Sequence, residues 1–240
     1  MRTLGISWQL ARRLATWGVA LVALGPWVGA GCVRVVQPPV TTVQVARAVQ
    51  RLASGASPWW PERRVVAREA IAPALRRAVL AAEDARFYTH HGFDLVEIEA
   101  ALDRKARGGR LRGASTITQQ VAKNLFLWEG RSYLRKGLEA WCTVALEVVV
   151  PKDRILDLYL NLAEWGDGTF GAEAAAQRWF GTSAKGLSGG QAARLAAVLP
   201  APRRWRPDGA VAQRRASFIM ARMRSVSAYA PARAAATTLD

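Results

Sequence analysis

The stretch Gly113-Ala-Ser-Thr-Ile-Thr-Gln-Gln-Val-Ala-Lys-Asn124 indicates how most of this chain folds. Within it, Thr116 and Gln119 have the spacing of a capping box, in which two side chains satisfy the first amides of a helix. The apolar run that follows predicts a helix to about Leu127. The same signal returns at Ser188-Gly-Gly-Gln191, and no segment alternates convincingly like a strand. The sequence therefore favours an all-α fold class.

Further helices follow from apolar residues spaced three or four apart. From about Ile71 the chain reads as helical almost throughout, and Leu75, Val79, Ala82 and Phe87 form one apolar stripe. The other predicted helices span residues 43–52, 95–105, 133–150, 151–162, 188–200 and 211–226, and a glycine-rich loop is expected at 166–171. We place one soluble domain at residues 70–227, between a connector at 34–69 and a tail at 228–240.

Composition points to a globular, strongly basic protein. The 240 residues are 51% hydrophobic, carry a net charge of +16 and have a pI of about 11.3. Such a field favours anionic partners, namely nucleic acid, anionic lipid or phosphorylated substrates. The two cysteines, Cys32 and Cys142, have no metal-ligand spacing around them, and we expect no disulfide between them.

The N-terminus carries a membrane-anchor pattern. Leu14–Val33 holds no charged residue and is flanked by Arg13 and Arg34, and its 20 residues are about the length that spans hydrocarbon. Arginines before the span place residues 1–13 in the cytoplasm and the rest outside. A cleaved signal peptide and a lipoprotein site at Gly29-Ala-Gly-Cys32 are the alternatives.

Glu83 is the first candidate for chemistry. It lies four residues after Val79 and four before Phe87, so in a continuous helix the three share an apolar face. A carboxylate among apolar neighbours has a raised pKa, which suits general acid–base work. The plain alternative is an ordinary surface glutamate at a helix end, and His90 lies beyond it near that expected end.

A second candidate is the polar helix start described above. Ser115 and Thr116 precede a helix whose first amides can bind phosphate. Gln119, Gln120 and Lys123 add donors within two turns. Alone, this pattern is equally that of a cap that merely starts a helix.

A third candidate lies between residues 131 and 139. Glu139 follows Arg135 by four residues, with Lys136 between them, and Arg131 adds a further charge. Such pairs are common on helices and contribute only tenths of a kcal/mol. Here they precede a long, nearly apolar helix, where concentrated positive charge would stabilise a departing pyrophosphate.

Together these segments resemble the peptidoglycan glycosyltransferases of glycosyltransferase family 51, in size and organisation their single-function members. Five family motifs occur in order within residues 70 to 207: Glu83-Asp-x-x-Phe87-x-x-His90-x-Gly92; Gly113-x-Ser-Thr-Ile-Thr-Gln-Gln120 with Lys123-Asn124; Arg135-Lys-x-x-Glu139; Lys152-x-x-Ile-Leu-Asp-x-Tyr-Leu-Asn161; and Ala192-Ala-x-Leu-Ala-Ala-x-Leu-Pro200. The chain departs from the family at supporting positions, with Asp157 in place of the more frequent Glu and Trp179 in place of Tyr.

The resemblance implies a lysozyme-like, two-lobed helical domain that polymerises lipid II. Glu83 would deprotonate the 4-hydroxyl of the acceptor GlcNAc, which attacks the growing chain with inversion and releases undecaprenyl pyrophosphate. Glu139 would be the second catalytic residue, organising the basic groups. The implied substrate-binding residues are Asp84, Phe87, His90, Gly113, Ser115, Thr116, Gln119, Gln120, Lys123, Asn124, Arg131, Arg135 and Lys136.

The resemblance also sets expectations for cofactors, partners and location. No cofactor is required and no resident metal site is expected, although Mg²⁺ or Mn²⁺ could assist at the donor pyrophosphate. Expected partners are lipid II, the growing glycan strand, membrane lipids and wall-synthesis or division proteins, with no nucleic acid. The enzyme would be a single-pass inner-membrane protein with a periplasmic catalytic domain. No Ser-x-x-Lys or Lys-Thr-Gly occurs, so no transpeptidase is expected.

Two other functions fit parts of the sequence. A lysozyme-like hydrolase or lytic transglycosylase also uses a glutamate in a helical cleft, but it needs no cations for a pyrophosphate. A basic, membrane-tethered binding protein for nucleic acid or anionic lipid would be favoured by charge alone.

Overall fold

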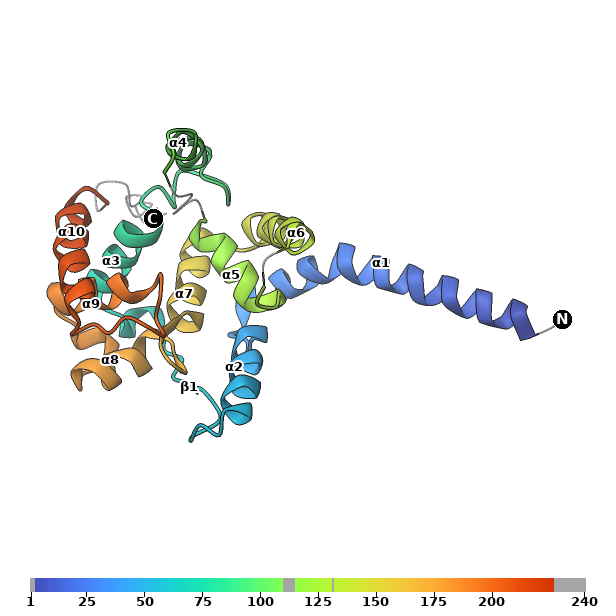
Figure 1. Cartoon of the computed structure of the whole chain (residues 1–240), viewed down its shortest axis with the longest axis horizontal. Helices are drawn as coiled ribbons and strands as arrows, with labels where there is room; N and C mark the ends of the chain where they lie inside the picture. The colour runs from blue at the N-terminus through green and yellow to red at the C-terminus, as the bar shows by residue number, and fades with distance from the viewer. Residues whose placement is uncertain (1–2, 110–114, 131, 227–240) are drawn as a thin grey trace, which may run out of the picture.

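The computed structural model describes residues 3–109, 115–130 and 132–226, with side chains from Trp8 onward (Figure 1). It confirms the all-α, lysozyme-like prediction with an N-terminal apolar helix. The helices are α1 (Thr3–Val35), α2 (Thr42–Ala53), α3 (Pro73–Glu83), α4 (Leu95–Ala106), α5 (Ile117–Phe126), α6 (Tyr133–Val149), α7 (Lys152–Leu162), α8 (Ala172–Phe180), α9 (Gly189–Val198) and α10 (Ala210–Val226), with short 3₁₀ turns η1 (Arg68–Ala70) and η2 (Ala184–Gly186).

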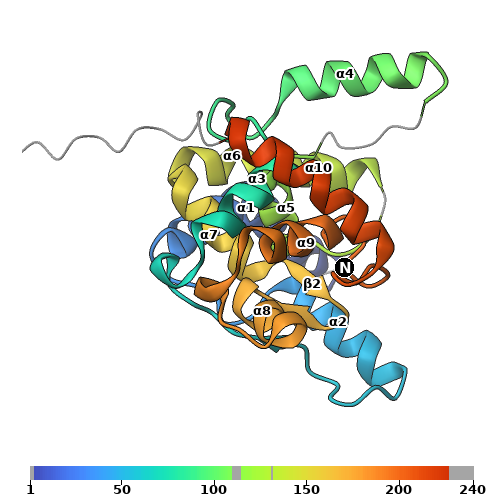
Figure 2. The same ribbon diagram turned by 90° about the vertical axis from the view of Figure 1, so that its left-hand side faces the viewer.

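The helices pack in two groups around one core. In the first, α3, α9 and α10 pack together, and α9 presents buried alanines that let its neighbours approach closely. In the second, α5 packs between α6 and α7, and α6 also contacts α1. Figure 2 shows α4 standing out at one edge of the domain, where only its Ala101 is buried. This arrangement leaves the ends of α3 and α5 between the two groups.

A small sheet corrects the expectation of no strands. β1 (Glu62–Arg63) pairs in parallel with β3 (Thr169–Phe170), which pairs antiparallel with β2 (Glu164–Gly166). Strands of two or three residues are too short to show alternation in a sequence. The predicted glycine loop is therefore a hairpin, and the chain before the domain pairs with it. Helix α8 was also absent from the predicted helices.

Helix α1 is consistent with the predicted membrane anchor. Residues 8–35 form one helix long and apolar enough to cross a membrane, with a mean hydropathy of 1.6 in its best window. Its N-terminal part stands away from the domain (Figure 1), and its C-terminal part is clamped to it. Trp27 and Trp141 pack edge to face with ring centres 5.6 Å apart, and Arg34 donates to the Val149 carbonyl at 2.9 Å. Both cysteines are free, as predicted.

Gly171 joins the β2–β3 hairpin to α8, and its backbone conformation can be tested by substitution. Its φ is +82°, and a Cβ there would lie 3.1 Å from the carbonyl oxygens of Arg64 and Asn161. We expect Gly171→Ala to destabilise the fold by about 1–3 kcal/mol and lower the Tm, because backbone atoms cannot yield. Gly190→Ala is the matched control, since a Cβ within α9 meets nothing within 4 Å. Thermal unfolding by circular dichroism of the detergent-solubilised chain measures both, and equal Tm values would contradict the expectation.

Candidate active site

Glu83 is the last residue of α3 and faces α5. Its Oε2 accepts a hydrogen bond of 2.8 Å from Nε2 of Gln120, and Oε1 of that amide accepts one of 3.3 Å from the hydroxyl of Tyr159. Tyr159 is fully buried on α7. Three helices therefore fix the carboxylate through one amide, which leaves its other oxygen available to a ligand.

The surroundings of Glu83 shift its acidity in the direction that general base chemistry needs. Burial raises the pKa of Glu83 above the ordinary value of a glutamate. The Gln120 hydrogen bond and the charges of Arg215 and Lys123 act in the opposite direction and lower the pKa. The carboxylate is thus partly dehydrated and lies within the field of cationic side chains, and a raised pKa favours general base chemistry.

Asp84 explains why α3 ends where it does. Its Oδ1 bonds Nε2 of His90 at 2.9 Å, and its Oδ2 accepts the amide of Ile117, the first residue of α5, at 3.0 Å. To reach both, the Asp84 backbone leaves the helix with φ −163°. The prediction of a helix continuing to Phe87 is wrong for this reason.

The start of α5 is closed by protein groups. The amide of Ile117 is bound by Asp84, and the amide of Gln119 donates to Oγ1 of Thr116 at 3.3 Å. The capping box is confirmed, but the prediction that these amides are free for phosphate is wrong. Thr116 also donates to the carbonyl of Gly92 at 2.7 Å. Of residues 115–119, only Ser115 is exposed. This helix start joins two motifs, and any anion binding must come from side chains.

Phe87 lies inside the core and not in the site. Its side chain is 0% exposed, packs edge to face on Tyr88 and lies under Nζ of Lys152 at 4.4 Å. A ligand cannot reach it, so the prediction that Phe87 contacts substrate is wrong. Asp84 and His90 are also buried, and they hold the segment between α3 and α4 in place.

Glu139 is not the ordinary surface pair that its spacing allowed. Its side chain is 4% exposed, and its two oxygens bind Nη1 of Arg135 at 2.8 Å and Nζ of Lys136. Within the described residues, the buried Nε of Arg135 has no hydrogen-bond partner. An ion pair with an unused donor is prepared to bind one further anionic group.

Lys123 links this ion pair to Glu83. Burial on α5 lowers the pKa of Lys123, and the charge of Glu139 opposes that shift. Across the described part of the chain, its ammonium makes no hydrogen bond. Asn124 follows on the same helix and is half-buried. Two other predicted site residues, Gly113 and Arg131, lie outside the described residues.

A cleft of about 400 Å³ opens beside Glu83. Asp84, Ser115 and Thr116, all predicted substrate-binding residues, line it. The segment before α4, α4 itself and α10 close it with residues that sequence reasoning missed: Arg86, Asp94, Glu97, Arg104 and Arg222. Arg215, one of the cations that lower the Glu83 pKa, is on α10 as well. The seven-residue spacing of Arg215 and Arg222 places them on one helix face, and that periodicity was a signal available in the sequence.

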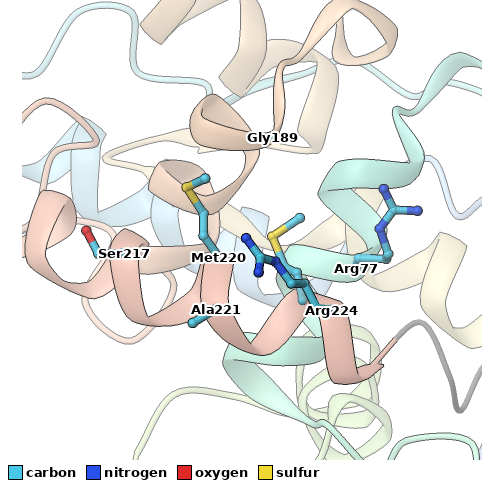
Figure 3. Close-up of a pocket in the computed structure, with 7 residues that line it drawn as sticks. Arg77, Gly189, Ser217, Met220, Ala221 and Arg224 are labelled. Atoms are coloured by element: carbon cyan, nitrogen blue, oxygen red, sulfur yellow. The ribbon is translucent and has the colours of Figure 1, made fainter.

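A larger hollow lies elsewhere. It measures about 740 Å³ and flanks α10, where Figure 3 shows Met220 and Arg224 near Arg77 of α3. None of the predicted catalytic residues lines it. The smaller cleft beside Glu83 is the better candidate because chemical groups, and not volume, define a site.

Comparison with known proteins identifies the family of this chain. The sequence model of the Transglycosylase family matches residues 50–224. This chain belongs to the transglycosylase family. Proteins called biosynthetic peptidoglycan transglycosylase are 53% identical in Xanthomonas oryzae pv. oryzae (strain KACC10331 / KXO85), over 83% of each chain, and 50% identical in Xanthomonas axonopodis pv. citri (strain 306), over 90% of each. A third, from Pseudomonas fluorescens (strain SBW25), is 55% identical over 79% of this chain and 80% of its own. The transglycosylase is thus an enzyme, a glycosyltransferase.

Two groups of carboxylates near the site already have protein partners. Both oxygens of Glu139 are bound by cationic side chains. Asp84, His90 and Asp94 bring ligand atoms within 4.8 Å of one another, but Asp84 is bound by His90 and a helix amide, and Asp94 accepts the amide of Glu97 at 3.1 Å. Protein partners thus occupy both oxygens of Glu139, both oxygens of Asp84 and one oxygen of Asp94.

Replacing Glu83 tests the cost of its burial. Because its pKa is raised on folding, the contribution of this group to stability is greatest below the unfolded pKa and is lost as pH rises through the folded pKa. We expect Glu83→Gln to have a higher Tm than the wild type at neutral pH, with the difference closing as pH falls. Calorimetry across a pH series measures this, with exposed Glu99→Gln on α4 as the control. A Glu83→Gln Tm at or below the wild-type value at pH 7 would refute it.

Proposed function

We propose that this transglycosylase of peptidoglycan synthesis polymerises glycan from lipid II, with Glu83 as general base. The supporting observation is the position of Glu83, whose partly dehydrated carboxylate accepts a hydrogen bond from Gln120 of α5. The charge of Lys123, also on α5, lowers the pKa of Glu83. The acceptor would enter the cleft beside Glu83, and the donor pyrophosphate would meet the cations of α5 and α6. One helix would then align both partners of the reaction.

The proposed step is a single displacement. Glu83 accepts the proton of the 4-hydroxyl of the acceptor GlcNAc as that oxygen forms a bond to the anomeric carbon of the donor MurNAc. The bond between this carbon and the pyrophosphate oxygen breaks, and its electron pair leaves with undecaprenyl pyrophosphate. Attack opposite the leaving group inverts the anomeric carbon. The raised pKa of Glu83 brings its basicity closer to the task at neutral pH.

The second requirement is to stabilise the negative charge on the departing pyrophosphate. Lys123 and the unpartnered Nε of Arg135 supply donors in a partly buried setting, where electrostatic stabilisation is stronger than in water. Glu139 acts indirectly by holding Arg135 and Lys136. Positive side chains would therefore stabilise the charge of the departing pyrophosphate. A glycan hydrolase has no use for such a cluster.

The anchor matches a lipid-linked substrate. With α1 in the inner membrane and its arginine-flanked start in the cytoplasm, the catalytic domain would be periplasmic. We also propose that the activity is limited to glycan polymerisation. Acylation of the purified chain by a labelled β-lactam would contradict that limit.

Glu83→Gln is the direct test of the general base. We expect lipid II turnover to fall by about 100-fold or more, since the amide cannot accept the proton. Product formation from fluorescent lipid II measures the rate, and circular dichroism verifies the fold. The wild type is assayed in parallel on finished glycan. Near-normal polymerisation by the variant refutes the role of Glu83, and cleavage of finished glycan without consumption of lipid II indicates a hydrolase.

Lys123→Ala tests the leaving-group cations. We expect turnover to fall by roughly 100-fold, as it does when an electrostatic stabiliser of a transition state is removed. The Tm should change little, because burial already disfavours the charged ammonium. Lys185→Ala, an exposed lysine of η2, is the matched control and should retain wild-type turnover. A loss of activity that merely followed a loss of stability would show that Lys123 is structural.

A further inference from the structure

A second polar hollow lies across the domain from the cleft. It measures about 580 Å³ and forms between the end of α2, the loop after it, β1 and the β2–β3 turn. Figures 1 and 2 place the end of α2 at the edge opposite α4, which borders the cleft beside Glu83. The lining residues that matter here are Arg51, Trp60, Glu62, Arg64, Asp167 and Arg178. No part of the proposed reaction uses them.

Two exposed indoles mark this hollow. Trp60, in its wall, is 41% exposed, and its neighbour Trp59 is 51% exposed. Their rings pack edge to face with centres 5.5 Å apart. Large aromatic surfaces are normally buried, so a paired exposure beside a hollow indicates a binding surface. The loop is held to α2, since the Pro58 carbonyl accepts from Nε and Nη2 of Arg51 at 3.1 and 2.9 Å.

The polar wall is equally well ordered. Nη1 of Arg51 donates to Asp167 at 2.7 Å, and Nη1 of Arg178 donates to the Asp167 carbonyl at 2.9 Å. Gly168 makes room for this, because a Cβ there would lie 2.9 Å from Nη1 of Arg51. Within the described residues, Arg51 uses three of the five N–H donors that a guanidinium carries. Oriented donors thus remain for a ligand.

These features match the chemistry of an acidic sugar. A pyranose ring has an apolar C–H face that packs on an indole and a rim of hydroxyls that bonds planar polar side chains. The lining carries three arginines against two carboxylates, which favours a ligand with a negative charge. We propose that this hollow, with Trp60 as its aromatic wall, binds a carboxylate-bearing unit of a finished glycan strand.

The choice of saccharide rests on the proposed function, whereas the hollow itself does not. The end of α2, which lines the hollow, is at the edge opposite α4, which lines the cleft, so in this proposal the strand it holds is not the one growing in the cleft. The anchored enzyme would thereby be tethered to existing wall polymer while it makes new polymer. A lipid surface is the other partner that exposed tryptophans suit, and the experiment must separate the two.

Binding of lipid-free strands tests the proposal. The full chain in detergent is titrated calorimetrically with glycan strands released from sacculi and, separately, with neutral N-acetylglucosamine oligomers. We expect Trp60→Ala to weaken strand binding by roughly tenfold, as loss of a central aromatic contact does. Trp60→Phe should retain most of the affinity. Neutral oligomers should bind more weakly than strands, and salt should weaken the strand complex.

Controls separate this site from the cleft and from the membrane. Phe218→Ala removes an aromatic of α10 that is 67% exposed, and it should leave strand binding intact. Glu83→Gln should likewise bind strands. A wild-type chain that binds strands but consumes no lipid II would refute the polymerase alone. Unchanged strand binding in Trp60→Ala, or loss in Phe218→Ala instead, overturns the proposal. So does a Trp60→Ala variant that loses only its attachment to phosphatidylglycerol vesicles.

Discussion

The structure of the site depends on where the Asp84 carboxylate goes. Asp84 bonds both His90 and the first amide of α5, so α3 ends at Glu83, the residue before it. The same bonds fix the distance between α3 and α5, which belong to different packing groups. Glu83 is therefore the last helical residue and points across to Gln120. Breaking the two hydrogen bonds of this buried carboxylate costs free energy, because each partner would be left unpaired. The bonds of Asp84 thus hold Glu83, its neighbour and the proposed general base, in position.

The same contact explains what the sequence could and could not predict. Helix starts were predictable, since Thr116, Ser132 and Ser188 each accept the amide that a local cap requires. The end of α3 was not, because its cause is an amide 33 residues away in the chain. The short strands were missed for a related reason, as β1 finds its partner more than a hundred residues later. At this point in the fold, a local signal determines where α5 begins, and a distant contact determines where α3 stops.

The candidate site shows a similar division. Its residue types and spacing were readable from the sequence, and the structure brings Glu83, Gln120, Lys123 and Glu139 into one electrostatic neighbourhood. The spacing of these residues could not show which side chains are exposed and which are buried. Glu139 has the pattern of a weak surface pair and yet is buried, whereas Phe87 lies in a motif and yet is in the core. The α10 arginines come from a helix without a motif, so only the fold places them beside Glu83.

The clamp between α1 and the domain has a consequence for how substrate is met. The Trp141 indole donates to the backbone of α1, and Arg34 and Arg154 lock the helix end from either side. With the anchor in a bilayer, the catalytic head cannot swing on a loose tether. It keeps one height and one tilt as it drifts laterally. Encounter with a lipid-borne sugar then becomes a search in two dimensions, in which every collision presents the reactants at matching elevation.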